Sequence, residues 1–174
     1  MVTRLALKLG LAFCTAFHAA PALPQDITWT PDATEACLAE QSDRDMLEVC
    51  IGRSAALCID TPDGYTTVGM SFCANQEAVY WDNRLNAAYQ ALSAIEAERD
   101  AAMAEFGSAA PSMSDALRDM QRAWITFRDA SCAYEASQWG GGSGTGPAVL
   151  SCRMHITGTQ ALALEARLRA KKAQ

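Results

Sequence analysis

Apolar residues recur at helical spacing along three long stretches of this sequence. In the first, residues 67–104, they follow one another at steps of four and three, as expected for one face of a helix. This seam consists of Trp81, Leu85, Ala88, Leu92 and Ile95. Gly107 and Pro111 then mark the end of the predicted helix.

Two more helices are predicted in the second half of the chain. Ser112 or Ser114 is a suitable N-cap for the first of them, and Asp115 in its first turn suits the helix dipole. Its seam is Leu117, Met120, Trp124, Phe127 and Ser131. The last helix is expected to begin near Pro147, with Gly158 as a weak point. Its seam is Leu150, Met154, Thr157, Ala161, Leu164 and Leu168.

The N-terminal part is predicted to be a smaller helical unit. Residues 35–56 have helical composition with a break near Ser42 and Asp43, and residues 60–64 form a turn cluster. No long alternating β pattern occurs. We therefore expect an all-α fold, an antiparallel helical bundle of three main helices plus an N-terminal disulfide-stapled helical hairpin.

Residues 1–22 have the pattern of a secretory signal peptide. A basic start precedes an apolar run over residues 9–20, followed by small residues at the cleavage positions. Lipidation at Cys14 is disfavoured because Phe13 is bulky where a small residue is needed. We expect a periplasmic or secreted protein with no membrane span after this leader. The expected organisation is a leader over 1–22, a hairpin extension over 23–57 and a helical domain over 58–174.

Six cysteines follow the leader, an even number that suits an oxidising compartment. They allow 15 connectivities, and the sequence does not select one. Spacings of 13, 15 and 20 residues favour sequential pairing, with about 3 kcal/mol of stabilisation for each bridge. The predicted bridges are Cys37–Cys50, Cys58–Cys73 and Cys132–Cys152. With no CxxC motif and only His155 left after the leader, we expect no metal and no cofactor.

Charge limits the classes of partner. Without the leader the chain has 12 basic and 20 acidic residues, a net charge of −8. Such a chain is repelled by nucleic acid and by anionic membranes, which leaves basic proteins as the favoured partners. Solubility alone also explains an acidic surface. The sequence does not set the oligomeric state.

A glycine-rich loop separates the last two predicted helices. Its glycines either permit a simple flexible connection or form a recognition loop whose ends are held by the Cys132–Cys152 bridge. Trp139 is the candidate anchor beside it. The candidate binding residues are Trp139, Gly140, Gly141, Gly142, Ser143, Gly144, Thr145 and, on the preceding helix, Arg128.

The roles of the neighbouring residues stay open at this stage. Trp124 fits a core position better than an interface. Arg128, which is next to Asp129, either makes an interhelical ion pair that positions the loop or is an exposed binding residue. Catalysis by Ser143 is disfavoured, because a helix precedes the glycines where a nucleophile elbow or a phosphate loop requires a strand. Catalysis by His155 is disfavoured, because a lone helical histidine usually lies at the surface or makes a hydrogen bond between helices. We expect a protein that is not an enzyme.

Three blocks of the sequence resemble one family. The segments LNAAYQAL (85–92), LRDMQRAWITFRDASC (117–132) and GGS…SC (141–152) are similar to the signature blocks of the LprI-type lysozyme inhibitor family. The likeness covers roughly residues 58–168, so the hairpin before it looks like an addition. One departure is Gln160, where the family often has an arginine.

The resemblance implies an exported helical protein that binds and inhibits lysozyme. Lysozymes are typically basic proteins with carboxylates in a cleft, so an acidic scaffold that presents a glycine-rich loop fits such a target. The alternative function is a periplasmic accessory module that binds another exported protein without inhibiting lysozyme. An unrecognised hydrolase is the third hypothesis, with Ser143 and His155 as its named residues.

Overall fold

The computed structural model describes residues 27–41 and 44–173, and every regular element in these ranges is helical. The predicted all-α fold is confirmed. The predicted leader over residues 1–22 and the break at Ser42 and Asp43 lie outside the described residues. The elements are α1 (Asp32–Glu40), the 3-10 helix η1 (Arg44–Cys50), α2 (Arg53–Ile59), α3 (Thr67–Glu105), α4 (Met113–Ser137) and α5 (Thr145–Lys172).

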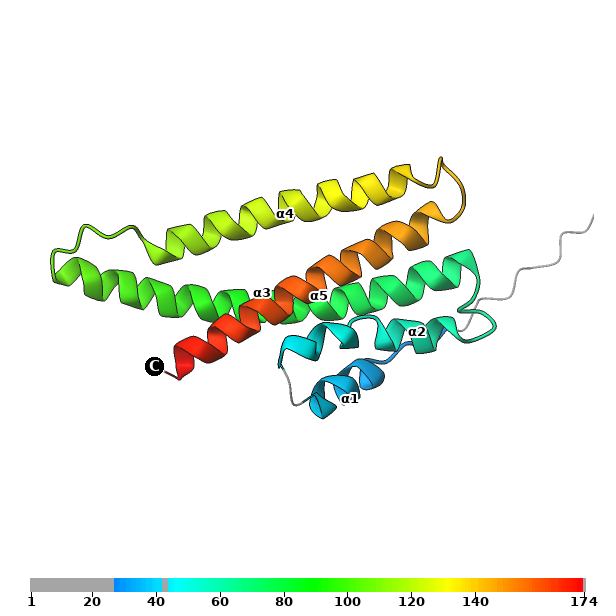
Figure 1. Ribbon diagram of the computed structural model, residues 1–174, viewed down its shortest axis with the longest axis horizontal. Coiled ribbons are helices and arrows are strands. Elements are labelled where there is room, and N and C mark those ends of the chain that lie inside the picture. Colours follow the sequence, from blue (N-terminus) through cyan, green and yellow to red (C-terminus); the bar gives the residue numbers. More distant parts are fainter. Residues whose placement is uncertain (1–26, 42–43, 174) are drawn as a thin grey trace, which may run out of the picture.

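Helix α3 is the longest element, and the other helices are arranged around it (Figure 1). Helix α5 crosses α3 and makes the most extensive packing with it, while α4 runs beside both. The short elements α1, η1 and α2 lie on the other side of α3 from α4. As a result, the connection between α4 and α5 lies at the end of the bundle where α3 begins.

Local hydrogen bonds fix where α3 and α4 begin. The Thr66 hydroxyl accepts a hydrogen bond from the Gly69 N–H at 2.9 Å, which satisfies a free donor of the first turn of α3. The Ser112 hydroxyl accepts one from the Asp115 N–H at 3.1 Å, at the start of α4. Gly107 follows the C-terminus of α3 with a φ of 70°, a conformation that favours glycine. Both helices therefore begin where the sequence predicted.

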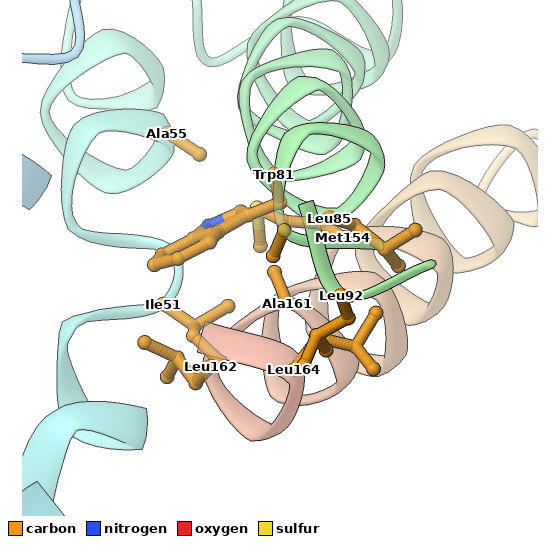
Figure 2. Packing of buried hydrophobic residues seen from close by; sticks show 10 residues of the cluster. Ile51, Ala55, Trp81, Leu85, Leu92, Met154, Ala161, Leu162 and Leu164 are labelled. Carbon is orange, nitrogen blue, oxygen red and sulfur yellow. The ribbon is translucent and has the colours of Figure 1, made fainter. Parts of the chain in front are cut away.

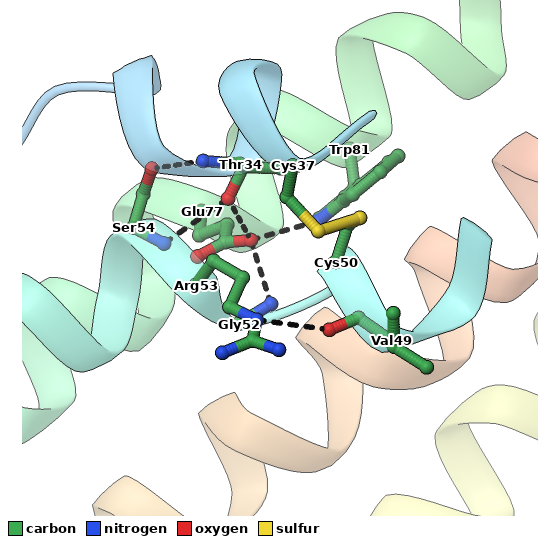
Figure 3. The surroundings of a disulfide bond; sticks show 9 residues. All are labelled: Thr34, Cys37, Val49, Cys50, Gly52, Arg53, Ser54, Glu77 and Trp81. Atoms are coloured by element: carbon green, nitrogen blue, oxygen red, sulfur yellow. Dashed lines mark hydrogen bonds between the residues drawn. A yellow bond between two sulfur atoms is a disulfide. The ribbon is translucent and has the colours of Figure 1, made fainter. Parts of the chain in front are cut away.

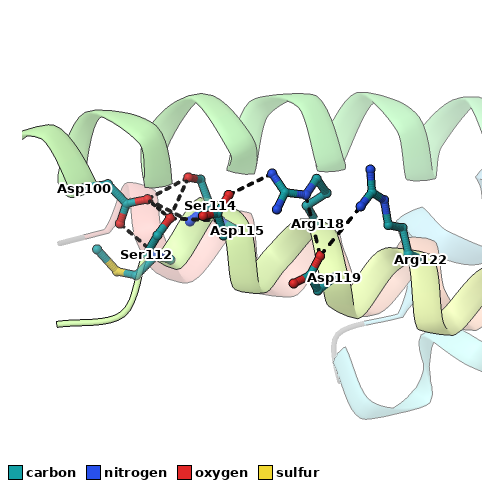
Figure 4. A network of polar contacts seen from close by, with 8 residues as sticks. Asp100, Ser112, Ser114, Asp115, Arg118, Asp119 and Arg122 are labelled. Carbon is teal, nitrogen blue, oxygen red and sulfur yellow. Dashed lines mark hydrogen bonds and ion pairs between the residues drawn. The ribbon is translucent and has the colours of Figure 1, made fainter.

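Asp100 ties the last turns of α3 to the first turn of α4 (Figure 4). Its carboxylate accepts hydrogen bonds from the hydroxyls of Ser112 and Ser114 and from the N–H groups of Met113 and Ser114, at 2.6 to 3.0 Å. These bonds, the one from the Ser114 hydroxyl foremost, lower the pKa of Asp100 far below its ordinary value because they stabilise the charged form. The turn between the two helices is thus closed by one carboxylate.

The hydrophobic core lies between α3, α5 and the N-terminal segment (Figure 2). Trp81 is its largest side chain and is fully buried. Of the predicted α3 seam, only Ile95 is less than fully buried. The core residues are Ile51, Ala55, Trp81, Leu85, Ala88, Leu92, Met154, Ala161, Leu162 and Leu164.

One sequence-based expectation about packing is wrong, and one glycine has a role that the sequence did not indicate. Phe127 was expected in the inward seam of α4, yet 61% of it is exposed. The fully buried residues of α4 are Gln121 and Cys132, and Phe127 lies about 120° around the helix from Gln121. Gly158, expected as a weak point of α5, is buried against Ile51, whose Cδ1 would lie 2.8 Å from a Cβ at this position. This glycine lets the N-terminal segment approach α5 closely.

A buried carboxylate holds the N-terminal segment on α3 (Figure 3). Glu77 has no exposed surface. Its Oε1 accepts hydrogen bonds from the Thr34 hydroxyl at 2.8 Å, the Gly52 N–H at 2.7 Å and Trp81 Nε1 at 3.2 Å. Its Oε2 accepts one from the Ala55 N–H at 2.6 Å. Four donors, from α1, from the first turn of α2 and its N-cap, and from α3, thus converge on the Glu77 carboxylate. Their hydrogen bonds compensate the cost of burying this group.

Two disulfides lie in the same region. Cys37 is bonded to Cys50, with the Cα atoms 5.5 Å apart, and this bridge joins α1 to η1. Cys58 is bonded to Cys73, with a Cα separation of 5.7 Å, and this bridge joins α2 to α3. They are the pairs that the spacing favoured, and together they attach the N-terminal segment covalently to the bundle.

Candidate functional site

The glycine-rich connection between α4 and α5 forms a tip at one end of the bundle. We call residues 139–145 the glycine tip. The tip is exposed from Trp139 to Ser143, and Trp139 itself is 51% exposed. The neighbouring Gly146 lies close to Ser71 near the start of α3, where a Cβ would be 3.2 Å from the serine hydroxyl. The base of the tip therefore rests on the bundle while its end faces solvent.

Short-range hydrogen bonds give the tip a defined shape. Gly140 and Gly141 have φ values of 55° and 80°, which non-glycine residues rarely adopt. The Gly142 N–H donates to the Trp139 carbonyl at 2.8 Å, and the Thr145 hydroxyl donates to the Gly142 carbonyl at 2.8 Å. These contacts make the connection a compact turn.

The indole of Trp139 is held within this turn. Its six-membered ring lies over Gly144, and a Cβ at that position would overlap the ring. The glycine is therefore required for the ring to fold back onto the tip. Half of the indole still faces solvent, which leaves an aromatic surface at the end of the molecule.

The third disulfide lies behind the tip. Cys132 on α4 is bonded to Cys152 on α5, with the Cα atoms 5.5 Å apart, and this is again the pair that the spacing favoured. It closes a loop of 20 residues that contains the whole tip. Because the bridge joins the two helices directly, it fixes the distance between the ends from which the tip projects.

An open groove of about 810 Å³ lies beside the tip, between α4 and α5. Tyr134, which is 66% exposed, forms part of its α4 side. The lining residues are Ala130, Ser131, Tyr134, Glu135, Trp139, Ala148, Ser151, Cys152, His155 and Ile156. Neither this groove nor Tyr134 was predicted from the sequence. The sequence feature that could have indicated the groove is a spacing of four residues, which places two residues on one helical face. Ala130 and Tyr134 have this spacing on one helix, and Ser151 and His155 have it on the next.

Arg128 is not brought to the tip. It lies nine residues before the end of α4, about 14 Å along the helix axis. Its Nε donates to Asp129 at 2.9 Å, so the ion pair is between adjacent residues of one helix and not between helices, contrary to one of the two expected roles. Its guanidinium lies 5.1 Å from the centre of the Trp124 ring, and it covers that half-buried side chain.

The structure does not assemble the residues named for a hydrolase. Ser143 lies on the exposed tip, whereas His155 lies ten residues into α5, about 15 Å along its axis. Among the residues that the structure describes, no group of three or more histidine, cysteine, aspartate or glutamate side chains has the arrangement of a metal site. Within the same ranges, no helix has both the length and the apolar character needed to cross a bilayer.

Gln160 and Gln121 connect α5 to α4 between the groove and the far end of the bundle. The Gln160 side-chain amide donates to the Gln121 carbonyl oxygen at 3.0 Å. Gln160 stands where the family that the sequence resembles often has an arginine. In this chain it makes a neutral hydrogen bond between the two helices that support the tip.

Comparison with known proteins gives one family and two relatives without a described function. The family model for lysozyme inhibitor LprI matches residues 58–164, more than half of the chain. An uncharacterized 17.7 kDa protein of Rhodobacter capsulatus is 25% identical over 139 residues, which cover 79% of this chain and 86% of the relative. An uncharacterized protein of Rhizobium meliloti (strain 1021) is 28% identical over 98 residues, or 56% of this chain and 70% of the relative. No solved structure matches.

Proposed function

This chain belongs to the LprI lysozyme inhibitor family, and from this membership we propose that it is an exported protein that binds a lysozyme and blocks its cleft. The observation that supports this best is the glycine tip, an exposed turn that two helices joined by a disulfide hold at the end of the bundle. Three disulfides agree with a place outside the reducing cytosol, either periplasmic or secreted.

The end of the tip is narrow, as a loop that enters a cleft must be. From Gly140 to Gly142 it carries no side chain beyond hydrogen, so its backbone N–H and C=O groups can approach a partner closely. Because the turn is already closed by hydrogen bonds, less conformational entropy is lost when it binds. The N–H groups of Gly140 and Gly142 already donate to the carbonyls of Ser137 and Trp139. We expect the backbone of the tip to reach the carboxylates of a lysozyme cleft through N–H groups that the turn itself does not use, such as that of Gly141.

Trp139 is the proposed anchor of the contact. Aromatic side chains dominate the energy of many protein interfaces, and half of this indole is exposed beside the tip. The adjoining groove, with Tyr134 on its α4 side, offers further apolar surface to a lysozyme. Arg128 is too far along α4 to take part in a contact centred on the tip.

Charge supports the encounter of the two proteins. Residues 23–135 carry 19 acidic and 7 basic side chains. A basic lysozyme is attracted to such a surface, which raises the association rate more than it raises the final affinity. We therefore expect the association rate to fall as ionic strength rises.

The direct test is lysis of peptidoglycan by a basic lysozyme in the presence of excess purified protein. We expect slower lysis with the wild-type chain. Trp139→Ala should weaken inhibition about 30-fold, the loss expected for an interface residue worth about 2 kcal/mol. Phe106→Ala is the matched control, because Phe106 is an 86% exposed aromatic residue that directly follows α3, whose C-terminus lies at the opposite end of the bundle from the tip (Figure 1).

The outcomes separate the proposal from its alternative. Unchanged lysis at every ratio of the two proteins, together with no detectable complex, would reject lysozyme inhibition and leave an accessory role in binding another exported protein. Inhibition that Trp139→Ala and Phe106→Ala affect equally would keep the function but move the contact away from the tip.

A further inference from the structure

A row of mostly exposed apolar side chains runs along α4, beside the residues of this helix that pack inward. Its members are Ala116, Met120, Ala123, Phe127, Ala130 and Tyr134, which we call the α4 stripe. Met120 is half-buried and the other five are exposed, Phe127 by 61%. The inward face of the same helix consists of other residues, among them Gln121 and Cys132. Apart from Met120, which also packs against the core, the stripe is thus apolar surface that faces solvent, and its last two members also line the groove beside the tip.

The spacing of the stripe is that of a helix-pairing surface. Successive members are four, three, four, three and four residues apart, which is the heptad pattern of helices that pack side by side. The stripe extends over 18 residue steps, about 27 Å of helix. Exposed apolar patches of this length on soluble proteins generally mark an interaction site.

The order of large and small residues in the stripe shows which helix fits it. The sequence reads small, large, small, large, small, large from Ala116 to Tyr134. A second copy of α4 laid antiparallel along a two-fold axis reverses this order, so Phe127 faces Ala123 of the second copy. In the same way Tyr134 faces Ala116, and Met120 faces Ala130. Every large side chain then meets an alanine, whereas a parallel pair would set Phe127 against Phe127.

We propose that two copies of this protein pair through the α4 stripe, antiparallel and related by a two-fold axis. Such a contact is isologous, so each residue pair occurs twice and the interface is closed. The inference does not depend on lysozyme binding. In this arrangement the two glycine tips lie at opposite ends of the paired helices and outside the contact, whereas Ala130 and Tyr134, which also line the groove, are covered by the second copy.

Charge on α4 permits this contact in an otherwise acidic protein. The helix has four acidic and three basic residues, close to neutral. Along the flank of the stripe, Arg118 is paired with Asp115 at 2.8 Å, and Arg122 lies 3.9 Å from Asp119 (Figure 4). Two copies can therefore approach along this face without placing uncompensated like charges together.

The size of the contact predicts a weak dimer. A stable protein interface buries about 800 Å² on each partner, and one pair of helices in contact over about 27 Å offers less than this. We therefore expect an equilibrium between monomer and dimer that shifts with protein concentration, not an obligate dimer.

Sedimentation velocity over a wide range of concentrations tests the pairing with three variants of the full chain. Phe127→Ala removes the large side chain of the central layer, and Ala123→Phe sets two large side chains against each other. Because each position occurs in both copies, Phe127→Ala removes two buried aromatic contacts and Ala123→Phe creates two clashes, and each should raise the concentration of half-dimerisation about tenfold or more. The double variant Ala123→Phe with Phe127→Ala exchanges the two positions, so it should restore dimerisation to within about threefold of wild type.

Ile125→Ala is the control, because Ile125 is exposed on α4 but lies off the stripe. It should leave the equilibrium unchanged, and far-UV circular dichroism should show all variants equally helical because the substituted positions are exposed. A wild-type chain that stays monomeric throughout would overturn the proposal and leave the stripe to a helix of a different protein. A dimer that is unaffected by Phe127→Ala, or a double variant that is not restored, would also overturn it.

Discussion

Replacing Glu77 with glutamine should destabilise the protein by about 3 kcal/mol. The carboxylate accepts four hydrogen bonds, three at Oε1 and one at Oε2 from the Ala55 N–H at 2.6 Å. A glutamine can keep its oxygen toward the three donors, but its NH₂ group then faces the Ala55 N–H. The substitution therefore removes one hydrogen bond to a charged acceptor, which is worth about 1.5–3 kcal/mol. It also leaves the buried Ala55 N–H without a partner, which costs about 1–3 kcal/mol more before the site relaxes.

The consequence is measurable by thermal unfolding under non-reducing conditions. For a chain of this size, 1 kcal/mol corresponds to about 2–4 °C, so Glu77→Gln should lower the unfolding temperature by about 6–12 °C. Hydrogen exchange should show faster exchange at the Gly52 and Ala55 amides, which depend on the carboxylate. Glu98→Gln, at an exposed position of the same helix, is the control and should change stability by less than about 0.5 kcal/mol. An equally small effect of Glu77→Gln would refute the view that this carboxylate holds the N-terminal segment in place.

Three more predictions concern the tip and the turn opposite to it. Replacing both Cys132 and Cys152 with serine should cost about 3 kcal/mol of stability and make the tip the first site cut in limited proteolysis; a tip as resistant as in wild type would contradict its dependence on the bridge. Gly144→Ala should displace the Trp139 indole and change its fluorescence with little change in stability, and an unaltered spectrum would show that the ring does not rest on this glycine. Because the pKa of Asp100 is lower in the folded than in the unfolded chain, its stabilising contribution is present above its ordinary value of 3.8 and is lost as pH falls below it. Asp100→Asn should therefore lower the free energy of unfolding at neutral pH and reduce its decrease as the pH becomes acidic. Urea unfolding at several pH values measures both effects, and parallel plots of unfolding free energy against pH for the two proteins would contradict the prediction.

The long helices could be predicted because their determinants are local. The N-caps Thr66 and Ser112 act on residues three positions away, and the α3 seam follows from a period of 3.6 residues. Cysteine spacing also favoured the pairs that the structure contains, because short loops between neighbouring helices bring sequential cysteines together.

Contacts between distant residues could not be predicted in the same way. Glu77 and Thr34 are separated by 43 residues, and in sequence Glu77 looks like any polar residue of a long helix. Gly158 looked like a weak point because only the folded chain shows that Ile51 occupies the space beside it. Phe127 was placed inward because periodicity gives a seam but not the rotation of an outer helix about its axis.

The candidate site was predictable in part. The exposed tip and the bridge behind it follow from glycine content and cysteine spacing. The groove beside Tyr134 depends on how α4 and α5 sit against each other, which no local pattern specifies. Arg128 was grouped with the tip because it is near it in sequence, but nine helical residues separate it from the end of α4.

Calorimetric titration of the purified protein into a basic lysozyme tests most directly whether the tip presents a binding surface. We expect saturable binding with one lysozyme for each chain, weakened by added salt, reduced about 30-fold by Trp139→Ala and unchanged by Phe106→Ala. A titration with no binding heat at any temperature, from protein that also leaves peptidoglycan lysis unchanged, would contradict it.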